Sequence, residues 1–140
     1  MTDDPYDLAR FVAAQTPAYE RALQELRAGR KRTHWIWYVF PQIEGLGSSP
    51  TAQRFAIRSV EEAAAYAHHP VLGPRLREAV KAALSQPNRD ARAVFGSPDD
   101  LKFRSCLTLF ERAADEPGLF AEALDAFYDG ARDEETLRRL

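Results

Sequence analysis

Apolar side chains cover more than one side of a predicted helix between Ser97 and Ala114. The helix has a strong start signal, in which a cap residue and a proline precede two carboxylates that suit the positive end of the helix dipole. The apolar residues behind this start are Leu101, Phe103, Cys106, Leu107, Leu109 and Phe110. A helix that is apolar nearly all round is normally buried. We therefore expect other elements to surround residues 98–114.

Turns that contain proline or glycine divide the rest of the chain into short helices. Helix starts are predicted at Asp4-Pro5, Thr16-Pro17, Ser49-Pro50, Ser59, Gly73-Pro74, Asp90, Pro117 and Asp133, and glycine-capped ends at Gly29 and Gly130. Residues 35–40 favour a strand by composition, but periodicity does not separate so short an apolar run from a buried helical turn. We predict an all-α fold, a compact multihelical bundle of about eight short helices around a buried central helix at about 98–114.

Composition restricts the class of protein further. The 140 residues suffice for one domain, 1–140, with a core that needs no metal or disulfide. The 19 basic and 21 acidic residues give a net charge of −2, so no overall positive charge favours nucleic acid. A single cysteine, Cys106, excludes an intrachain disulfide and a CxxC-type zinc site.

No apolar run approaches the roughly 20 residues of a membrane span, and the acidic N-terminal segment lacks a signal peptide's apolar region. We expect a cytoplasmic protein.

Motifs spread along the chain carry a resemblance to a known family. They are DLARFVAAQ, ALQELRAGRKRTHWIWYVFPQIEGLGSSP, HPVLGPRL, VFGSPDDLKFRSCLTLF and the closing DGARDEETLRRL. By these motifs the chain resembles, over nearly its whole length, the bacterial family labelled domain of unknown function 1810. The resemblance implies a compact multihelical fold with a buried central helix, and it implies no mechanism. Some members carry the label calpastatin, but calpastatin-type inhibitors are disordered repeats, and this chain has neither a disordered composition nor repeats.

The stretch from Lys31 to Pro50 is the most unusual by composition and contains the first candidate site. His34 lies beside Trp35 and Trp37. Histidine titrates near neutral pH and is a common acid–base group, and tryptophans can form the walls of a pocket for a flat ligand. On this hypothesis His34 is catalytic, and Trp35 and Trp37 bind the ligand. The alternative is a core aromatic cluster in which His34 is hydrogen-bonded as a structural group.

A glycine-rich loop follows this aromatic segment. Glycines allow backbone N–H groups to approach a ligand closely, and a loop that leads into a helix suits an anion. The residues that would bind the ligand are Gln42, Gly45, Gly47 and Ser48, with the basic residues Arg30, Lys31 and Arg32 nearby in sequence. The spacing matches neither a Walker A motif nor GxGxxG. The alternative is an ordinary turn with a helix cap.

The central helix contributes the second group of candidates. Lys102 and Arg104 lie within its apolar sequence, and Lys102 shares a face with Ser105 one turn later. A lysine in apolar surroundings is costly unless it is paired or faces a cavity. Lys102 is therefore a candidate catalytic acid–base group or anion ligand, and Arg104 and Ser105 are candidate ligand-binding residues. Alternatively, each cation pairs with a carboxylate or reaches solvent.

No motif for a metal or a cofactor is present. His68 and His69 point to different sides of a helix, so they do not predict a metal pair, and Cys106 is expected to be a buried, inert thiol.

Two functions remain open. The first is a small-molecule-binding protein, with metal-free hydrolytic or acid–base chemistry as its enzymatic form, for a polar anionic ligand that resembles a nucleotide or a sugar phosphate. The second is a non-catalytic protein-binding or regulatory module, which would dock through the basic cluster at residues 27–32. Neither function involves a membrane, and nucleic acid is a distant third partner.

Overall fold

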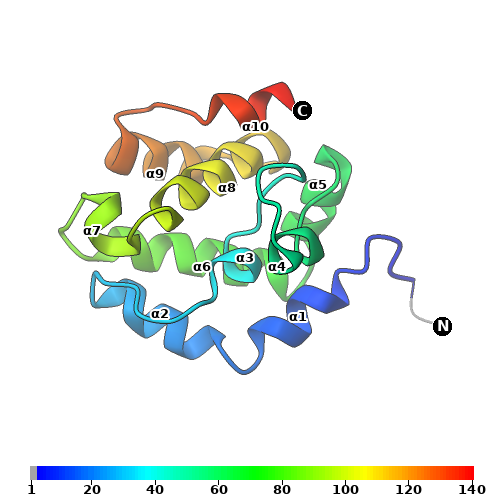
Figure 1. Cartoon of the computed structure of the whole chain (residues 1–140), viewed down its shortest axis with the longest axis horizontal. Helices are drawn as coiled ribbons and strands as arrows, with labels where there is room; N and C mark the ends of the chain where they lie inside the picture. Colours follow the sequence, from blue (N-terminus) through cyan, green and yellow to red (C-terminus); the bar gives the residue numbers. More distant parts are fainter. Residues whose placement is uncertain (1–2) are drawn as a thin grey trace.

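Helix α8 (Asp99–Ala113) runs through the middle of the structure, as its apolar residues predict (Figure 1). The computed structural model describes residues 3–140, and apart from one isolated β-bridge the regular elements of this range are α-helices. The others are α1 (Ala9–Gln15), α2 (Tyr19–Arg27), α3 (Ile36–Val39), α4 (Pro50–Arg54), α5 (Val60–His68), α6 (Leu72–Ser85), α7 (Ala91–Phe95), α9 (Gly118–Tyr128) and α10 (Glu134–Arg138). The all-α prediction is confirmed, with somewhat more helices in the described range than expected. Met1 and Thr2, at the start of the predicted domain, lie outside the described residues.

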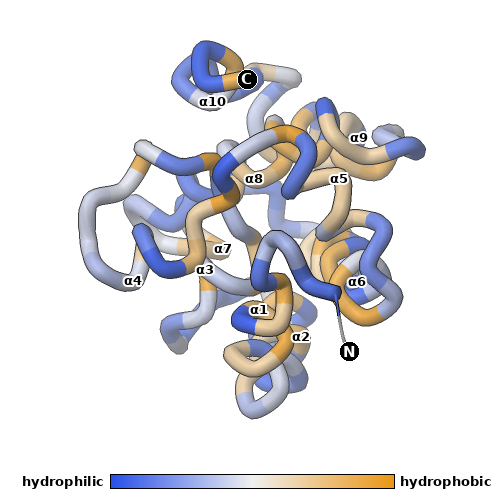
Figure 2. The backbone as a smooth tube through the Cα atoms, turned by 90° about the vertical axis from the view of Figure 1, so that its right-hand side faces the viewer, coloured by the Kyte–Doolittle hydropathy of each residue, from blue (hydrophilic) through white to orange (hydrophobic). Residues whose placement is uncertain are grey.

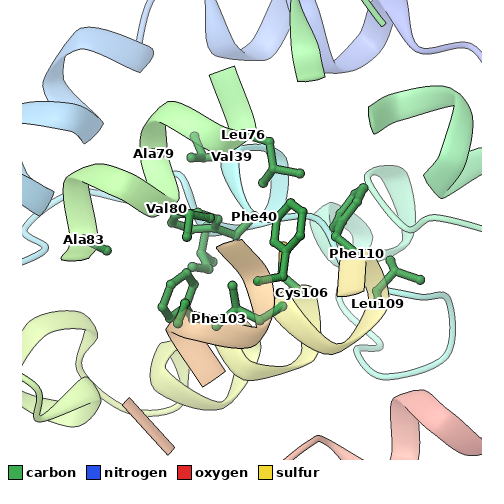
Figure 3. Packing of buried hydrophobic residues seen from close by; sticks show 14 of the residues in the cluster. Val39, Phe40, Leu76, Ala79, Val80, Ala83, Phe103, Cys106, Leu109 and Phe110 are labelled. Atoms are coloured by element: carbon green, nitrogen blue, oxygen red, sulfur yellow. The ribbon is translucent and has the colours of Figure 1, made fainter. Parts of the chain in front are cut away.

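Most of α8 is buried by the helices around it. It packs against α5, α7, α9 and α10, and its Phe103, Cys106 and Phe110 point towards α3 and α6 (Figure 3). Burial raises the pKa of the Cys106 thiol well above its ordinary value, as expected of an inert cysteine. The predicted Ser97 cap is wrong, because the residue before the helix is Pro98, whose side chain cannot cap. Leu101 is also misassigned to the buried face: it is 49% exposed, in the first turn of α8.

Aromatic rings join α8 to the helices on either side of it. The ring centroid of Phe103 lies 4.7 Å from that of Phe40, 4.4 Å from that of Phe95 and 5.8 Å from that of Phe127. All four side chains are buried. Offset and edge-to-face ring pairs add to the free energy of apolar burial. This cluster therefore fixes α7, α9 and the end of α3 against the central helix.

Two further helices begin later than predicted. α1 begins at Ala9 because the Asp4 carboxylate accepts hydrogen bonds from the backbone N–H groups of Leu8 and Ala9, at 2.8 and 3.0 Å. α2 begins at Tyr19, and the Thr16 hydroxyl does not cap it but donates to a carbonyl one turn back in α1. The predicted caps that hold are Ser49, Ser59, Asp90 and Asp133.

The aromatic segment at residues 35–40 forms the short helix α3 and not a strand. The backbone N–H groups of Val39 and Phe40 donate to carbonyls one turn earlier. The nearest β-type contact, between Ile43 and Ile57, is an isolated bridge. A strand at 35–40 would need a pairing partner, and the surrounding segments are helical.

Buried Glu25 in α2 fixes the turn that leads into α3. Its carboxylate accepts hydrogen bonds from the backbone N–H groups of Arg32 and Thr33 at 2.7 and 3.0 Å. It also accepts from the Thr33 hydroxyl at 2.7 Å and from the Trp35 indole at 2.9 Å. Burial alone would raise the pKa of Glu25, but these donors outweigh it and lower the pKa to about 2. Trp35, 1% exposed, is therefore held in the core against α2.

The C-terminal helix α10 lies at the periphery, beyond α8, and is largely hydrophilic (Figure 2). It is attached to α8 by its cap residue Asp133, whose backbone N–H donates to the Thr108 hydroxyl, and Thr136 in its first turn is fully buried. Within residues 3–140 no helix has the length and apolar character needed to cross a membrane.

Candidate functional site

A pocket of about 340 Å³ opens between α3, the loop after it, α4, the first turns of α8 and the α10 segment. Its apolar lining includes Trp37, Ile43, Leu46, Phe55, Pro98 and Leu101. Its polar lining comprises Gln42, Lys102, Ser105, Asp133 and Glu135. Segments far apart in sequence meet here, and in Figure 1 the loop after α3 rises along α8 towards α10. A mainly apolar cavity with a few polar groups is typical of a small-molecule site.

Backbone hydrogen bonds to Ile57 hold the loop after α3 at the pocket. The Ile57 N–H donates to the Gln42 carbonyl, and the Ile57 carbonyl accepts from the Glu44 N–H, both at 2.8 Å. Further along, Gly45 has a φ of +98°, and a Cβ there would lie 2.3 Å from the Arg139 guanidinium. Only glycine adopts this conformation without strain and leaves room for the arginine. The bridge to Ile57 therefore fixes the start of the loop, and Gly45 allows the Arg139 side chain to approach the loop backbone closely.

Asp99 lies between two lysines, one of them buried and the other at the pocket. Its carboxylate is 2.8 Å from Lys31 Nζ and 3.4 Å from Lys102 Nζ. Each ammonium also lies over an indole ring, Lys31 at 5.0 Å from the Trp35 centroid and Lys102 at 4.9 Å from the Trp37 centroid. The Lys31 side chain is 5% exposed and the Lys102 side chain 26% exposed. One carboxylate thus faces two cations, and Lys102 is the lysine of this pair that lines the pocket.

A second polar group joins α8 to α10 at the pocket. The Ser105 hydroxyl is placed to donate to Asp133 Oδ2 at 2.8 Å. The same oxygen accepts from the hydroxyl and the backbone N–H of Thr136, at 2.6 and 3.3 Å. The other oxygen, Oδ1, lies 3.9 Å from the Arg104 guanidinium. Both carboxylate oxygens of Asp133 therefore already have protein partners, in contacts that attach α10 to α8. Lys102 is more available than Asp133 to contact a ligand.

The pocket brings together part of the set predicted from sequence. The predicted residues that line it are Trp37, Gln42, Gly45, Gly47, Lys102 and Ser105. Those that do not line it are His34, Trp35, Ser48 and Arg104. Trp35 and Trp37 separate because residues two apart on a helical turn point to different sides. Trp35 consequently lies in the core, and Trp37 reaches the pocket.

Each remaining candidate outside the pocket has another environment. His34 is exposed before α3, and Ser48 is exposed near the end of the loop before α4. The Arg104 guanidinium lies 5.8 Å from the ring centroid of Tyr128 and pairs with Asp133. Lys31, expected to help hold an anion beside the glycine loop, is paired with Asp99 instead.

The apolar rim of the pocket and the C-terminal segment contribute lining residues that were not predicted from the sequence. By pattern Leu101 belongs to the core, whereas Asp133 and Glu135 belong to a cap and a solvated surface. In the structure all three line the pocket, and Phe55 after α4 joins them. The cap signal at Asp133 is correct, but nothing in the local pattern indicates that α10 returns to α8. That contact depends on the tertiary fold.

No group of three or more His, Cys, Asp or Glu side chains within residues 3–140 is placed to hold a metal ion. The two adjacent histidines have separate partners. His68 Nε2 lies 2.5 Å from Asp115, and this hydrogen bond raises the pKa of His68. His69 Nδ1 accepts hydrogen bonds from the backbone N–H groups of Val71 and Leu72 at the start of α6.

These features define a small all-α protein with a pocket beside its central helix. The chain belongs to the family of proteins of unknown function DUF1810, whose model matches residues 5–140. It is similar to the conserved hypothetical protein Rv1873 from Mycobacterium tuberculosis, known from a crystal structure, with 51% sequence identity, 98% of each chain covered and a TM-score of 0.96. A search among curated proteins finds no match. The resemblance seen in the motifs is confirmed, and neither of these descriptions states an activity.

Proposed function

We propose that this protein binds a small anionic molecule in the pocket between the loop after α3, the start of α8 and α10. The observation that carries the proposal is the position of Lys102. Its ammonium lines a mainly apolar cavity, and its carboxylate partner within residues 3–140, Asp99, is shared with the closer Lys31. A cation whose charge is incompletely balanced, in surroundings that exclude much of the solvent, interacts strongly with an anion.

The size of the pocket restricts the ligand. About 340 Å³ is near the lower end of the range of roughly 300–1,000 Å³ that is usual for ligand sites. A mononucleotide, a sugar phosphate or a small aromatic acid is compatible with this volume, and a dinucleotide is not. Trp37, Phe55 and Leu101 would contact the apolar part of the ligand, and Lys102 its anionic group.

The proposal is for binding without a catalytic step. The histidine predicted as acid–base group, His34, does not line the pocket. Ser105 does line it, but its hydroxyl is hydrogen-bonded to Asp133 in a contact that attaches α10 to α8. Lys102 is accordingly assigned to holding the ligand.

Replacing Lys102 by methionine is expected to weaken binding of an anionic ligand by about 10- to 100-fold, the loss typical of a charge-assisted hydrogen bond. Ligands are found by thermal-shift screening against nucleotides, sugar phosphates and metabolite acids, and their affinities are measured by calorimetry. Lys81→Met is the matched control, because Lys81 is exposed on α6 and does not line this pocket.

Equal loss of affinity in both variants, or full affinity in Lys102→Met, would contradict this assignment. If no compound in the screen stabilises the wild-type protein and a pull-down recovers a specific protein partner, a protein-binding module would be the better function.

A further inference from the structure

We infer that Gln42 recognises an amide-type edge of the ligand, meaning a neighbouring carbonyl and N–H as in a carboxamide, a lactam or a nucleobase. This inference rests on the proposed function, because it concerns the same pocket. It adds a second recognition element to the anion contact at Lys102.

Gln42 differs from the other glutamines inside the fold. Buried Gln15 donates to the Tyr38 carbonyl and the Tyr66 hydroxyl, and its own carbonyl oxygen accepts from Arg75. Polar side chains removed from solvent are normally satisfied in this way.

Gln86 follows the same rule. Its amide group donates to the carbonyls of Ala83 and Asn88, and its side-chain oxygen accepts from the Asn88 N–H at 2.7 Å. In the two buried glutamines, Gln15 and Gln86, both ends of the side-chain amide are therefore bonded to protein.

Gln42 is half-buried and lines the pocket, yet within residues 3–140 its side-chain amide makes no hydrogen bond to protein. Its backbone is held by the bond from Ile57, so the side chain starts from a fixed position. Whichever way the amide is turned, it presents one donor edge and one acceptor edge. A ligand with the complementary pair of groups satisfies both at once.

The other polar groups at the pocket leave this role to Gln42. Asp133 and Ser105 bond to one another, and Glu135 pairs with Arg138 beyond the rim. Lys102 supplies only donors. Gln42 is therefore the side chain in the pocket that offers both a donor and an acceptor without an existing protein partner.

The test compares two aromatic acids that share one carboxylate. The probe meta-carbamoylbenzoate carries a primary amide, and its N,N-dimethyl amide lacks the N–H groups. Wild-type protein is expected to bind the first about five- to tenfold more tightly, the effect of the one hydrogen bond that the dimethyl amide cannot donate to the Gln42 side-chain oxygen. In Gln42→Leu this preference is expected to disappear.

A second variant tests the direction of the hydrogen bonds. Gln42→Glu turns the amide into a carboxylate that only accepts, so its preference is expected to shift from meta-carbamoylbenzoate to meta-amidinobenzoate, whose amidinium only donates. Gln24→Glu, on the exposed face of α2, is the charge-matched control and is expected to keep the wild-type preference. Unchanged melting temperatures show that the variants are folded.

Equal affinity of the wild-type protein for the primary and the dimethyl amide would overturn the inference. If both probes then bind and both are lost in Lys102→Met, the anion site stands without the amide contact. Absence of binding by either probe at millimolar concentration would also overturn the inference, whereas the anion site is judged separately by the screening compounds and Lys102→Met.

Discussion

Replacing Glu25 by alanine is expected to lower the free energy of unfolding by about 3–5 kcal/mol. The substitution removes the acceptor shared by the Thr33 hydroxyl, the Trp35 indole and two backbone N–H groups. Each buried donor left without a partner costs about 1–3 kcal/mol, less where the turn relaxes and admits water. Denaturant unfolding followed by circular dichroism measures the change.

Glu20→Ala is the matched control, because Glu20 is exposed in the first turn of the same helix. Its loss is expected to stay within about 1 kcal/mol, the usual range of an interaction with the helix dipole. A Glu25→Ala variant as stable as Glu20→Ala would mean that the carboxylate does not organise the turn before α3.

The effect of Glu25 also depends on pH in a defined direction. Its pKa in the folded protein is about 2, below the ordinary 4.5. A lowered pKa gives a contribution that is complete above the unfolded pKa and is lost as the pH falls through the folded pKa. The difference in stability between wild type and Glu25→Ala should therefore shrink by about 3 kcal/mol between neutral pH and pH about 2, at about 1.4 kcal/mol per pKa unit. A constant difference over this range would contradict the assigned pKa.

Replacing Phe103 by alanine is expected to lower the free energy of unfolding by about 3–5 kcal/mol. Phe103 is fully buried, and its ring contacts those of Phe40, Phe95 and Phe127. The substitution loses apolar burial and leaves a cavity where α3, α7 and α9 meet α8. The same unfolding measurement applies.

Leu101→Ala serves as the control on the same helix. Leu101 is 49% exposed at the pocket, so its loss is expected to cost less than about 1 kcal/mol. Similar costs for the two variants would show that α8 is not the buried centre of the fold.

The helical fold and its central helix follow from patterns that are local in sequence. The apolar residues between Phe103 and Phe110 lie on more than one side of the helix, and that alone requires other helices around it. The caps at Ser59 and Asp133 are predictable for the same reason, because the bonding groups lie within one turn of each other. The start of α1 is not predictable in this way. The Asp4 carboxylate accepts from the backbone N–H groups of Leu8 and Ala9, four and five residues along the chain, whereas a cap residue normally bonds two or three residues ahead.

The candidate site is predictable only in part, because the side chains that line it are chosen by tertiary contacts. Lys102 is conspicuous in sequence as a cation within an apolar helix, and the structure places it at the pocket. Trp35 and Trp37 look equivalent in sequence, and the buried Glu25 carboxylate selects Trp35 for the core. The return of α10, which brings Asp133 to Ser105, has no signature in either segment.

The two indole N–H groups offer the most direct measurement of whether the pocket beside Lys102 binds the ligand. Trp37 lines the pocket, whereas Trp35 is buried and donates its indole N–H to Glu25. In a proton–nitrogen correlation spectrum of the nitrogen-labelled protein, Trp37→Phe assigns the two indole signals. Titration with the tightest anionic compound from the screen is expected to shift the Trp37 signal and to leave the Trp35 signal in place. In Lys102→Met the same ligand concentrations are expected to shift the Trp37 signal much less, and the Trp35 signal again stays in place. Saturable binding that leaves the Trp37 signal unmoved, or that persists unchanged in Lys102→Met, would contradict the proposed site.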